Sequence, residues 1–166
     1  MTIDSFLDYF SMYGYYFLFL IVFLEYLNLP GLPAGVIMPA AGILISQADM
    51  TFMTALVISV IAGILGSFVL YGIGYYVGNP AVHWMTTKFP KTQKPIDQTI
   101  GYIEKHGNKS IFLGRLLPVI RTIIALPAGA FKMKFIPFTL YSIGGITIWN
   151  AVYIFAGYAF GDWFLS

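Results

Sequence analysis

The chain lacks cysteine altogether, and only 10% of its 166 residues carry a charge. Without cysteine there can be no disulfides, thiolate metal sites or cysteine nucleophiles. The scarcity of charge excludes a soluble globular domain, in which about a quarter of the residues are charged. The two histidines, His83 and His106, lie far apart, so we expect neither a metal site nor another cofactor. Together with a mean hydropathy of +0.79, this composition predicts an integral membrane protein.

Basic residues are missing from the first half of the chain. All nine lie between Lys88 and Lys134, and the first 87 residues contain none. The acidic N-terminus therefore lacks the basic region of a cleaved signal peptide, and we expect it to be retained. Because loops rich in Lys and Arg stay on the cytoplasmic side, residues 79–110 and 132–134 are predicted to be cytoplasmic. Asp49 and the C-terminus would then lie outside.

Three apolar runs are long enough to form membrane helices. They cover residues 6–24, with the helix starting near Tyr9, then residues 51–78 and residues 135–164. A helix over the second run rises roughly 42 Å, more than the ~30 Å hydrocarbon core, so it spans the bilayer with a tilt. Small residues recur along this run, and we expect them to allow close helix packing: Gly63, Gly66, Ser67, Gly74 and Gly78.

Between the first two runs, residues 29–46 form an apolar stretch with three prolines and three glycines. These residues interrupt helices, so we do not expect one continuous spanning helix. Broken apolar backbone is tolerated at membrane depth only where protein or a cavity surrounds it. We therefore predict a re-entrant hairpin that enters and leaves on one side, shaped by Pro30, Pro33, Gly35, Pro39 and Gly42.

A second broken stretch, residues 114–133, is equally apolar but carries Arg115 and Arg121. An arginine at bilayer depth costs at least ~2.5–3.5 kcal/mol, so two of them need a compensating role. The planar fork of arginine binds phosphate or carboxylate through two parallel hydrogen bonds, which favours an anion held between the two side chains. The alternative is that both extend to headgroups at the membrane edge. We predict a second re-entrant hairpin, shaped by Gly114, Pro118, Pro127 and Gly129.

Glu25 follows directly on the first apolar run. Two interpretations are open for this carboxylate. It either marks a solvated helix end or faces a cavity next to the first hairpin.

The most polar part of the chain, residues 79–110, has five lysines against Asp97 and Glu104. Ile96, Ile100 and Ile103 follow helical spacing, so Pro95–His106 is predicted to be an amphipathic helix on the membrane surface. Lysines beside a membrane bind anionic headgroups at its cytoplasmic face, and nucleic acid is a poor partner.

The order of these segments indicates an inverted repeat in an all-α membrane protein. Each half contains a helix, a broken hairpin and a long transmembrane helix, with residues 1–78 as the first half, 79–110 as the linker and 111–166 as the second half. Gly42 corresponds to Gly129, and Gly74 to Gly161, both at an offset of 87 (129−42 and 161−74). Inverted repeats whose broken helices meet near the midplane recur in transporters.

The arginine stretch resembles a known signature. Gly-Arg-Leu-Leu-Pro-Val-Ile-Arg-Thr from Gly114, followed by Pro-Ala-Gly and Met133, is similar to that of the DedA family of bacterial membrane proteins, lipid transporters of the SNARE-associated, VTT-like superfamily. Gly144, Trp149 and Gly157 fit the last helix of that family. Glu25 fits the acidic residue that precedes its first hairpin.

The resemblance implies an activity and a set of residues. The family moves lipids such as undecaprenyl phosphate and phosphatidylethanolamine across the bacterial inner membrane, and many members depend on the proton gradient. Its functional residues carry over to Glu25, Arg115 and Arg121. Two positions depart from the pattern, because Gly35 and Ser67 stand where many members have acids linked to proton coupling.

We therefore expect a transporter of a phosphate-headgroup lipid in the bacterial cytoplasmic membrane, with that lipid and anionic headgroups as partners and a homodimer as an option. The first alternative is a proton-coupled antiporter of a small ion or osmolyte, with Glu25 as the proton site. A scaffold for other membrane proteins is another. An enzyme acting on lipid phosphate is not expected, because no nucleophile–base pair accompanies the arginines.

Overall fold

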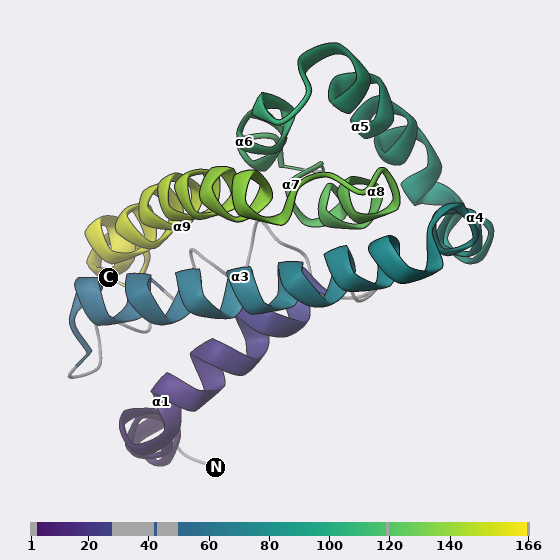
Figure 1. Cartoon of the computed structure of the whole chain (residues 1–166). Coiled ribbons are helices and arrows are strands. Elements are labelled where there is room, and N and C mark those ends of the chain that lie inside the picture. Colours follow the sequence, from purple (N-terminus) through teal and green to yellow (C-terminus); the bar gives the residue numbers. More distant parts are fainter. Residues whose placement is uncertain (1–2, 28–41, 43–49, 119, 166) are drawn as a thin grey trace.

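The computed structural model describes residues 3–27, 42, 50–118 and 120–165, and these form helices with no strand among them (Figure 1). Three helices are long: α1 (Ile3–Tyr26), α3 (Phe52–Val77) and α9 (Phe135–Leu165). The shorter elements are α4 (Asn79–Lys88), the 3₁₀ turn η1 (Pro90–Thr92), α5 (Gln93–His106), α6 (Lys109–Arg115), α7 (Ile120–Ile123) and α8 (Ala125–Ala130).

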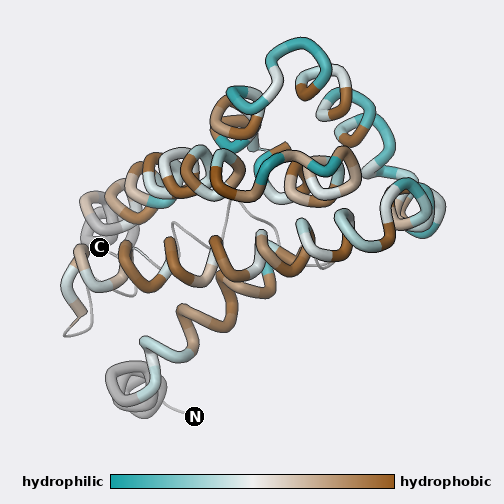
Figure 2. The backbone as a smooth tube through the Cα atoms, in the orientation of Figure 1, coloured by the Kyte–Doolittle hydropathy of each residue, from teal (hydrophilic) through white to brown (hydrophobic). Residues whose placement is uncertain are grey.

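Helix α3 forms the centre of the fold. Figure 1 shows α1 crossing one side of it, while α8 and α9 lie along the other. The part of the chain described contains two helices long and apolar enough to cross a membrane, Phe52–Val77 and Phe135–Gly157. Figure 2 shows that both are predominantly apolar, whereas hydrophilic residues concentrate around α4 and α5. The expected all-helical architecture is therefore confirmed.

The ends of α3 follow from local chemistry. Thr51 caps its N-terminus, since the Thr51 hydroxyl accepts a hydrogen bond from the Thr54 backbone N–H at 3.3 Å. Gly78 ends the helix with a φ of +70°, a conformation that glycine adopts without a steric penalty. The chain then turns into α4, a helix that the sequence pattern did not predict. Helix α5 matches the predicted amphipathic helix within two residues at its start.

Helices α3 and α8 approach each other at a pair of glycines. A Cβ added to Gly74 would collide with backbone atoms of Leu126 and Ala130, and one added to Gly129 would collide with the backbone of Tyr71 and Tyr75. The absence of side chains at both positions lets the two backbones touch. This contact confirms the packing role expected for Gly74.

Two prolines divide the arginine stretch into α6, α7 and α8. Proline has no N–H, so Pro118 cannot extend α6, and the chain turns after Arg115. Pro127 likewise cannot donate to the carbonyl of Ile123, where α7 ends. The predicted break in the helix is therefore confirmed. In the first broken stretch, Gly42 is helical and buried, whereas the positions predicted to shape the rest of that hairpin lie outside the described residues: Pro30, Pro33, Gly35 and Pro39.

Candidate functional site

The two arginines and Glu25 lie together in the protein interior. Arg115 and Arg121 are 1% and 0% exposed, and Glu25 is 2% exposed. Arginines that extended to headgroups would have exposed guanidinium groups, so that alternative is wrong. Glu25, at the end of α1, is not a solvated helix end either. Burial against neighbouring helices, which a linear sequence does not display, excludes both of these alternatives.

Arg121 has the stronger set of partners. Its Nη2 donates to Glu25 Oε1 in a buried ion pair. Its Nη1 donates to the hydroxyl of Tyr26 at 3.0 Å. The guanidinium also lies over the indole ring of Trp149, 4.9 Å from its centroid, a favourable cation–π distance. Arg121 is thus compensated by one charge, one hydroxyl and two aromatic faces, since the Tyr26 ring centroid also lies 5.2 Å from its guanidinium carbon.

Arg115 has only neutral partners among the described residues. Its Nη1 donates to the backbone carbonyl of Arg121 at 2.5 Å, and its Nη2 donates to the Ser142 hydroxyl at 3.2 Å. The rings of Tyr26 and Phe138 lie 5.8 and 5.9 Å from its guanidinium carbon. The bond to Arg121 also links the two sides of the turn that Pro118 creates, so the two arginines are held as one unit.

A chain of hydrogen bonds continues from the arginines into the core. The Tyr26 hydroxyl donates to Asn150 Oδ1 at 3.3 Å, and Asn150 Nδ2 donates to the Ser59 hydroxyl at 3.1 Å. All three residues are buried. None of these three residues was predicted from the sequence, and neither was Ser142. The available signal was that isolated polar residues in apolar membrane helices almost always face the protein interior.

Glycines create the space for this centre. A Cβ at Gly66 would lie 2.8 Å from the Cβ of Tyr26, so its absence lets the end of α1 pack on α3. A Cβ on Gly145 would collide with the Cβ of Arg115. These two positions on α3 and α9 therefore help to determine where Tyr26 and Arg115 lie.

The charges of the centre do not balance within the described part of the chain. Two guanidinium groups face one carboxylate, which leaves a net charge of +1. Four buried polar atoms there also have no hydrogen-bond partner: Glu25 Oε2, Arg115 Nε, Arg121 Nε and Trp149 Nε1. Three of the four are donors, and unpaired buried donors are costly. The centre is thus chemically suited to an anion with several acceptor oxygens.

Other predicted positions play structural roles here. Gly114 lies at the end of α6 against Ile124, and Gly129 lies in the contact with α3. Ser67 is buried, and its hydroxyl donates to the Gly63 carbonyl at 2.6 Å within α3. No group of three or more His, Cys, Asp or Glu side chains that could hold a metal occurs in the ranges that the structure describes.

Comparison with known proteins places the chain in a family. The VTT domain family matches residues 32–159. Protein DedA of Escherichia coli (strain K12) is 33% identical over 156 residues, which cover 92% of this chain and 71% of that protein. The uncharacterized membrane protein YkoX of Bacillus subtilis is 31% identical, covering 95% and 69% of the two chains. Undecaprenyl phosphate transporter A of Staphylococcus aureus is 29% identical, covering 95% and 79%.

No solved structure matches the chain. The family match covers well over half of it, and the relatives extend along nearly all of it. The apolar helices fit the same assignment. The chain therefore contains a VTT domain and belongs to the DedA family of membrane proteins.

Proposed function

We propose that this protein moves a phosphate-headgroup lipid, phosphatidylethanolamine or undecaprenyl phosphate, across the bacterial cytoplasmic membrane. The observation that carries the proposal is the buried centre with a net charge of +1 and three unpaired donors. A lipid phosphate supplies the missing charge and the acceptor oxygens, while its tail remains in hydrocarbon. The names of the relatives, which include an undecaprenyl phosphate transporter, support the same substrate class.

The geometry supports a competition for Arg121. Glu25 pairs with this arginine when no lipid is bound, and an arriving phosphate displaces the carboxylate. Arg115, which has only neutral partners in the described structure, offers the first contact. When Glu25 returns, it weakens the hold on the phosphate and promotes release. No covalent bond of the lipid is broken in this cycle, so the protein acts as a transporter and not as an enzyme.

The proposal includes the inverted repeat, with residues 1–78 and 111–166 as its halves and the linker 79–110 in the cytoplasm. Its support is the contact of Gly74 with Gly129. If the halves are related by the offset of 87 residues, Gly161 meets Gly42 in the equivalent way. Gly161→Leu should then lower the thermal stability in detergent about as much as Gly74→Leu, whose side chain would collide with the backbone of α8. A Gly161→Leu variant as stable as the wild type argues against the repeat.

Transport is tested with purified protein in liposomes. Fluorescent phosphatidylethanolamine and a polyprenyl phosphate are followed separately, each with and without a proton uncoupler. The proposal expects transport of at least one lipid by the wild type and none by the variant Arg115→Ala with Arg121→Ala. Full transport by that variant contradicts the phosphate-binding role. Transport that ignores the lipid headgroup but stops with the uncoupler would favour the antiporter alternative.

A further inference from the structure

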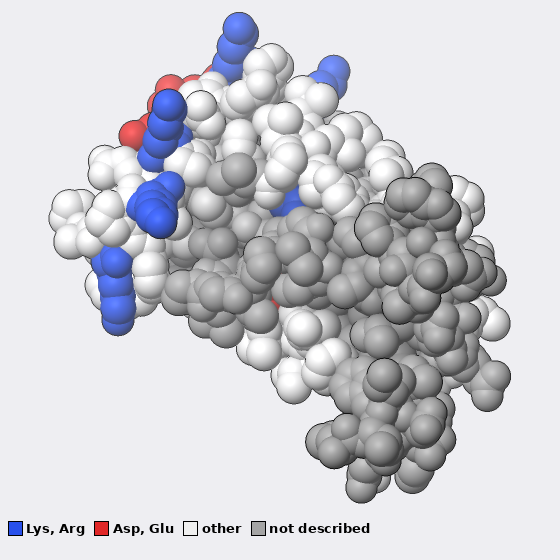
Figure 3. All heavy atoms as spheres, turned by 180° about the vertical axis from the view of Figure 1, so that it is seen from behind, with Lys and Arg blue, Asp and Glu red and all other residues white. Residues whose placement is uncertain are grey.

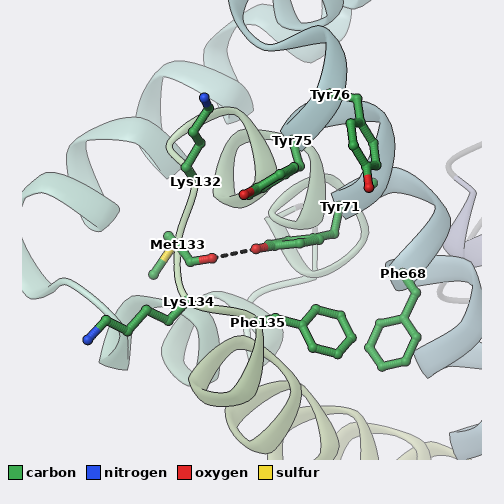
Figure 4. Close-up of a pocket in the computed structure, with 9 residues that line it drawn as sticks. Phe68, Tyr71, Tyr75, Tyr76, Lys132, Met133, Lys134 and Phe135 are labelled. Carbon is green, nitrogen blue, oxygen red and sulfur yellow. Dashed lines mark hydrogen bonds between the residues drawn. The ribbon is translucent and has the colours of Figure 1, made fainter.

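A second feature suited to a lipid lies outside the arginine centre. A pocket of about 470 Å³ opens between the last turns of α3 and the turn that leads into α9 (Figure 4). Its walls combine aromatic rings with a basic rim. The aromatic lining residues are Phe68, Tyr71, Tyr75, Tyr76 and Phe135, and the rim carries Lys132, Met133 and Lys134.

The rim of the pocket is attached to α3. The hydroxyl of Tyr71 donates to the backbone carbonyl of Met133, as the dashed line in Figure 4 shows. Lys132 has a φ of +51°, a conformation uncommon outside glycine, and its ammonium group lies 5.9 Å from the ring centroid of Tyr75. Lys132 and Lys134 leave this turn in different directions (Figure 4). The turn therefore contributes two positive charges to the rim of the pocket.

The pocket lies where α3 ends and α9 begins, and these are the two helices long enough to span a membrane. We therefore expect the pocket at the boundary between water and hydrocarbon. Tyr76 beside it is 88% exposed and Ile136 is 71% exposed. Apolar side chains at this depth contact acyl chains, while lysines reach the headgroups.

Two aromatic rings connect the pocket with the arginine centre. Tyr71, in the pocket lining, stacks on Phe138 with 4.5 Å between the ring centroids. Phe138 is fully buried, and its ring centroid lies 5.9 Å from the guanidinium carbon of Arg115. Tyr71 and Phe138 therefore form a continuous contact from the pocket to Arg115.

We propose that this pocket is the docking site at which a phosphate-headgroup lipid enters from the leaflet on the lysine-rich side, before it reaches Arg115. Lys132 and Lys134 attract the phosphate, and the aromatic walls hold the upper part of the tail. Tyr71 and Phe138 separate the docked lipid from the arginines. The proposal rests on the lipid transport proposed above and adds a route to it.

Gly72 is a suitable position for a substitution that fills the pocket. This glycine lines the pocket, and a Cβ added to it meets nothing within 4 Å. Gly72→Trp therefore introduces a bulky side chain at a position where the Cβ itself is free of clashes, and Gly72→Ala is the matched control. For the charges, Lys132→Ala with Lys134→Ala is compared with Lys91→Ala with Lys94→Ala, which removes two exposed lysines that do not line the pocket.

The probe is phosphatidylglycerol with a photoactivatable diazirine high on one acyl chain, in nanodiscs of a phosphate-free glycolipid. Labelled peptides are mapped by mass spectrometry. Labelling of residues 68–76 is expected in the wild type and much less with a diacylglycerol that carries the same diazirine but no phosphate. The labelling should fall in Gly72→Trp. It should also fall by roughly fivefold for each pocket lysine removed, which is the effect of one lysine near an anionic surface. Gly72→Ala and the variant Lys91→Ala with Lys94→Ala should both be labelled as strongly as the wild type.

The docking proposal is wrong if either the filled pocket or the lysine-free rim labels like the wild type, or if the diacylglycerol labels equally well. Arg115→Ala separates it from the proposed function. Docking precedes the arginines, so this variant should keep its labelling while it loses transport. A labelled Arg115→Ala that still transports would refute the arginine mechanism and leave the docking site intact. If the wild type is not labelled and Arg115→Ala does not transport, the docking site is refuted and the arginine mechanism stands.

Discussion

The arginine centre and the lysine-rich surface carry the same sign of charge in opposite surroundings. Arg115 and Arg121 are buried, whereas the five lysines between residues 88 and 109 are all exposed. Figure 3 shows basic side chains gathered at one end of the visible face. Water solvates the lysines fully, so they need no partner. The arginines depend on fixed protein groups, and those groups leave part of their charge and hydrogen-bonding capacity unused.

This difference indicates where function resides. A surface lysine contributes orientation and a general attraction for anionic lipids, about 1 kcal/mol for each residue near the membrane surface. A buried arginine contributes a specific site, because its surroundings exclude competing water. Substitutions in the two regions should therefore have sharply different effects on transport.

Removal of Arg121 should have the largest effect. Arg121→Ala should abolish transport. It should also destabilise the protein, since removing one partner of a buried ion pair costs about 3–5 kcal/mol. The double variant Arg121→Ala with Glu25→Gln removes both charges. It should regain much of the lost thermal stability in detergent and still fail to transport. Transport restored by the second substitution would show that Arg121 serves only to neutralise Glu25.

Replacement of Arg115 by lysine should have the next largest effect. The charge remains, but the planar fork that binds two oxygens is lost. Because hydrogen bonds to charged groups are worth about 1.5–3 kcal/mol, the affinity for a lipid phosphate should fall about tenfold or more, with partial transport. Lipid titration in detergent measures this change. Wild-type affinity in Arg115→Lys would mean that any buried cation is sufficient.

Glu25→Gln should have a smaller and more diagnostic effect. If Glu25 competes with the phosphate for Arg121, the lipid should bind more tightly and leave more slowly, so turnover falls while affinity holds or rises. If Glu25 instead contacts a substrate amine, binding of phosphatidylethanolamine should weaken and binding of a polyprenyl phosphate should not. Affinity and transport of both lipids separate the cases. Unchanged values for both lipids would remove Glu25 from the site.

The smallest effect is expected at the surface. Lys88→Ala with Lys91→Ala removes two exposed charges, and transport in liposomes should stay near the wild-type level. Correct insertion is checked with cysteines at positions 49 and 92, of which only the first should react with an impermeant reagent from outside cells. A loss of transport as severe as that of the arginine variants would erase the contrast between the two regions.

The bounds of α3 and α9 were predictable because hydrophobic runs determine them, whereas α1 begins at Ile3 and not near Tyr9 as expected. Residues 51–78 were predicted and Phe52–Val77 are helical, and the last helix agrees within one residue at its end. The break after Arg115 also followed from sequence, since Pro118 and Pro127 lack the backbone donor that a continuous helix requires. Helix α4 was missed because its composition is too mixed to show a periodicity.

The site was predictable only in part. Arg115, Arg121 and Glu25 stood out because charges in apolar segments are rare, but their burial and the pairing of Glu25 with Arg121 depend on how distant helices pack. Tyr26 and Asn150 were missed for the same reason. Their positions in the sequence are ordinary, and only the fold brings them to the arginines.

The most direct test of a phosphate held by the arginines uses a property of the sequence, because Arg115 and Arg121 are its only arginines. Protein labelled with nitrogen-15 in arginine therefore gives two sets of guanidinium signals in solid-state NMR. The protein is placed in a phosphate-free glycolipid, a polyprenyl phosphate is added, and the dipolar coupling between nitrogen-15 and phosphorus-31 is measured. The account predicts that both guanidinium groups couple to the phosphorus, as bonded neighbours must. A bound lipid whose phosphorus couples to neither arginine would contradict it.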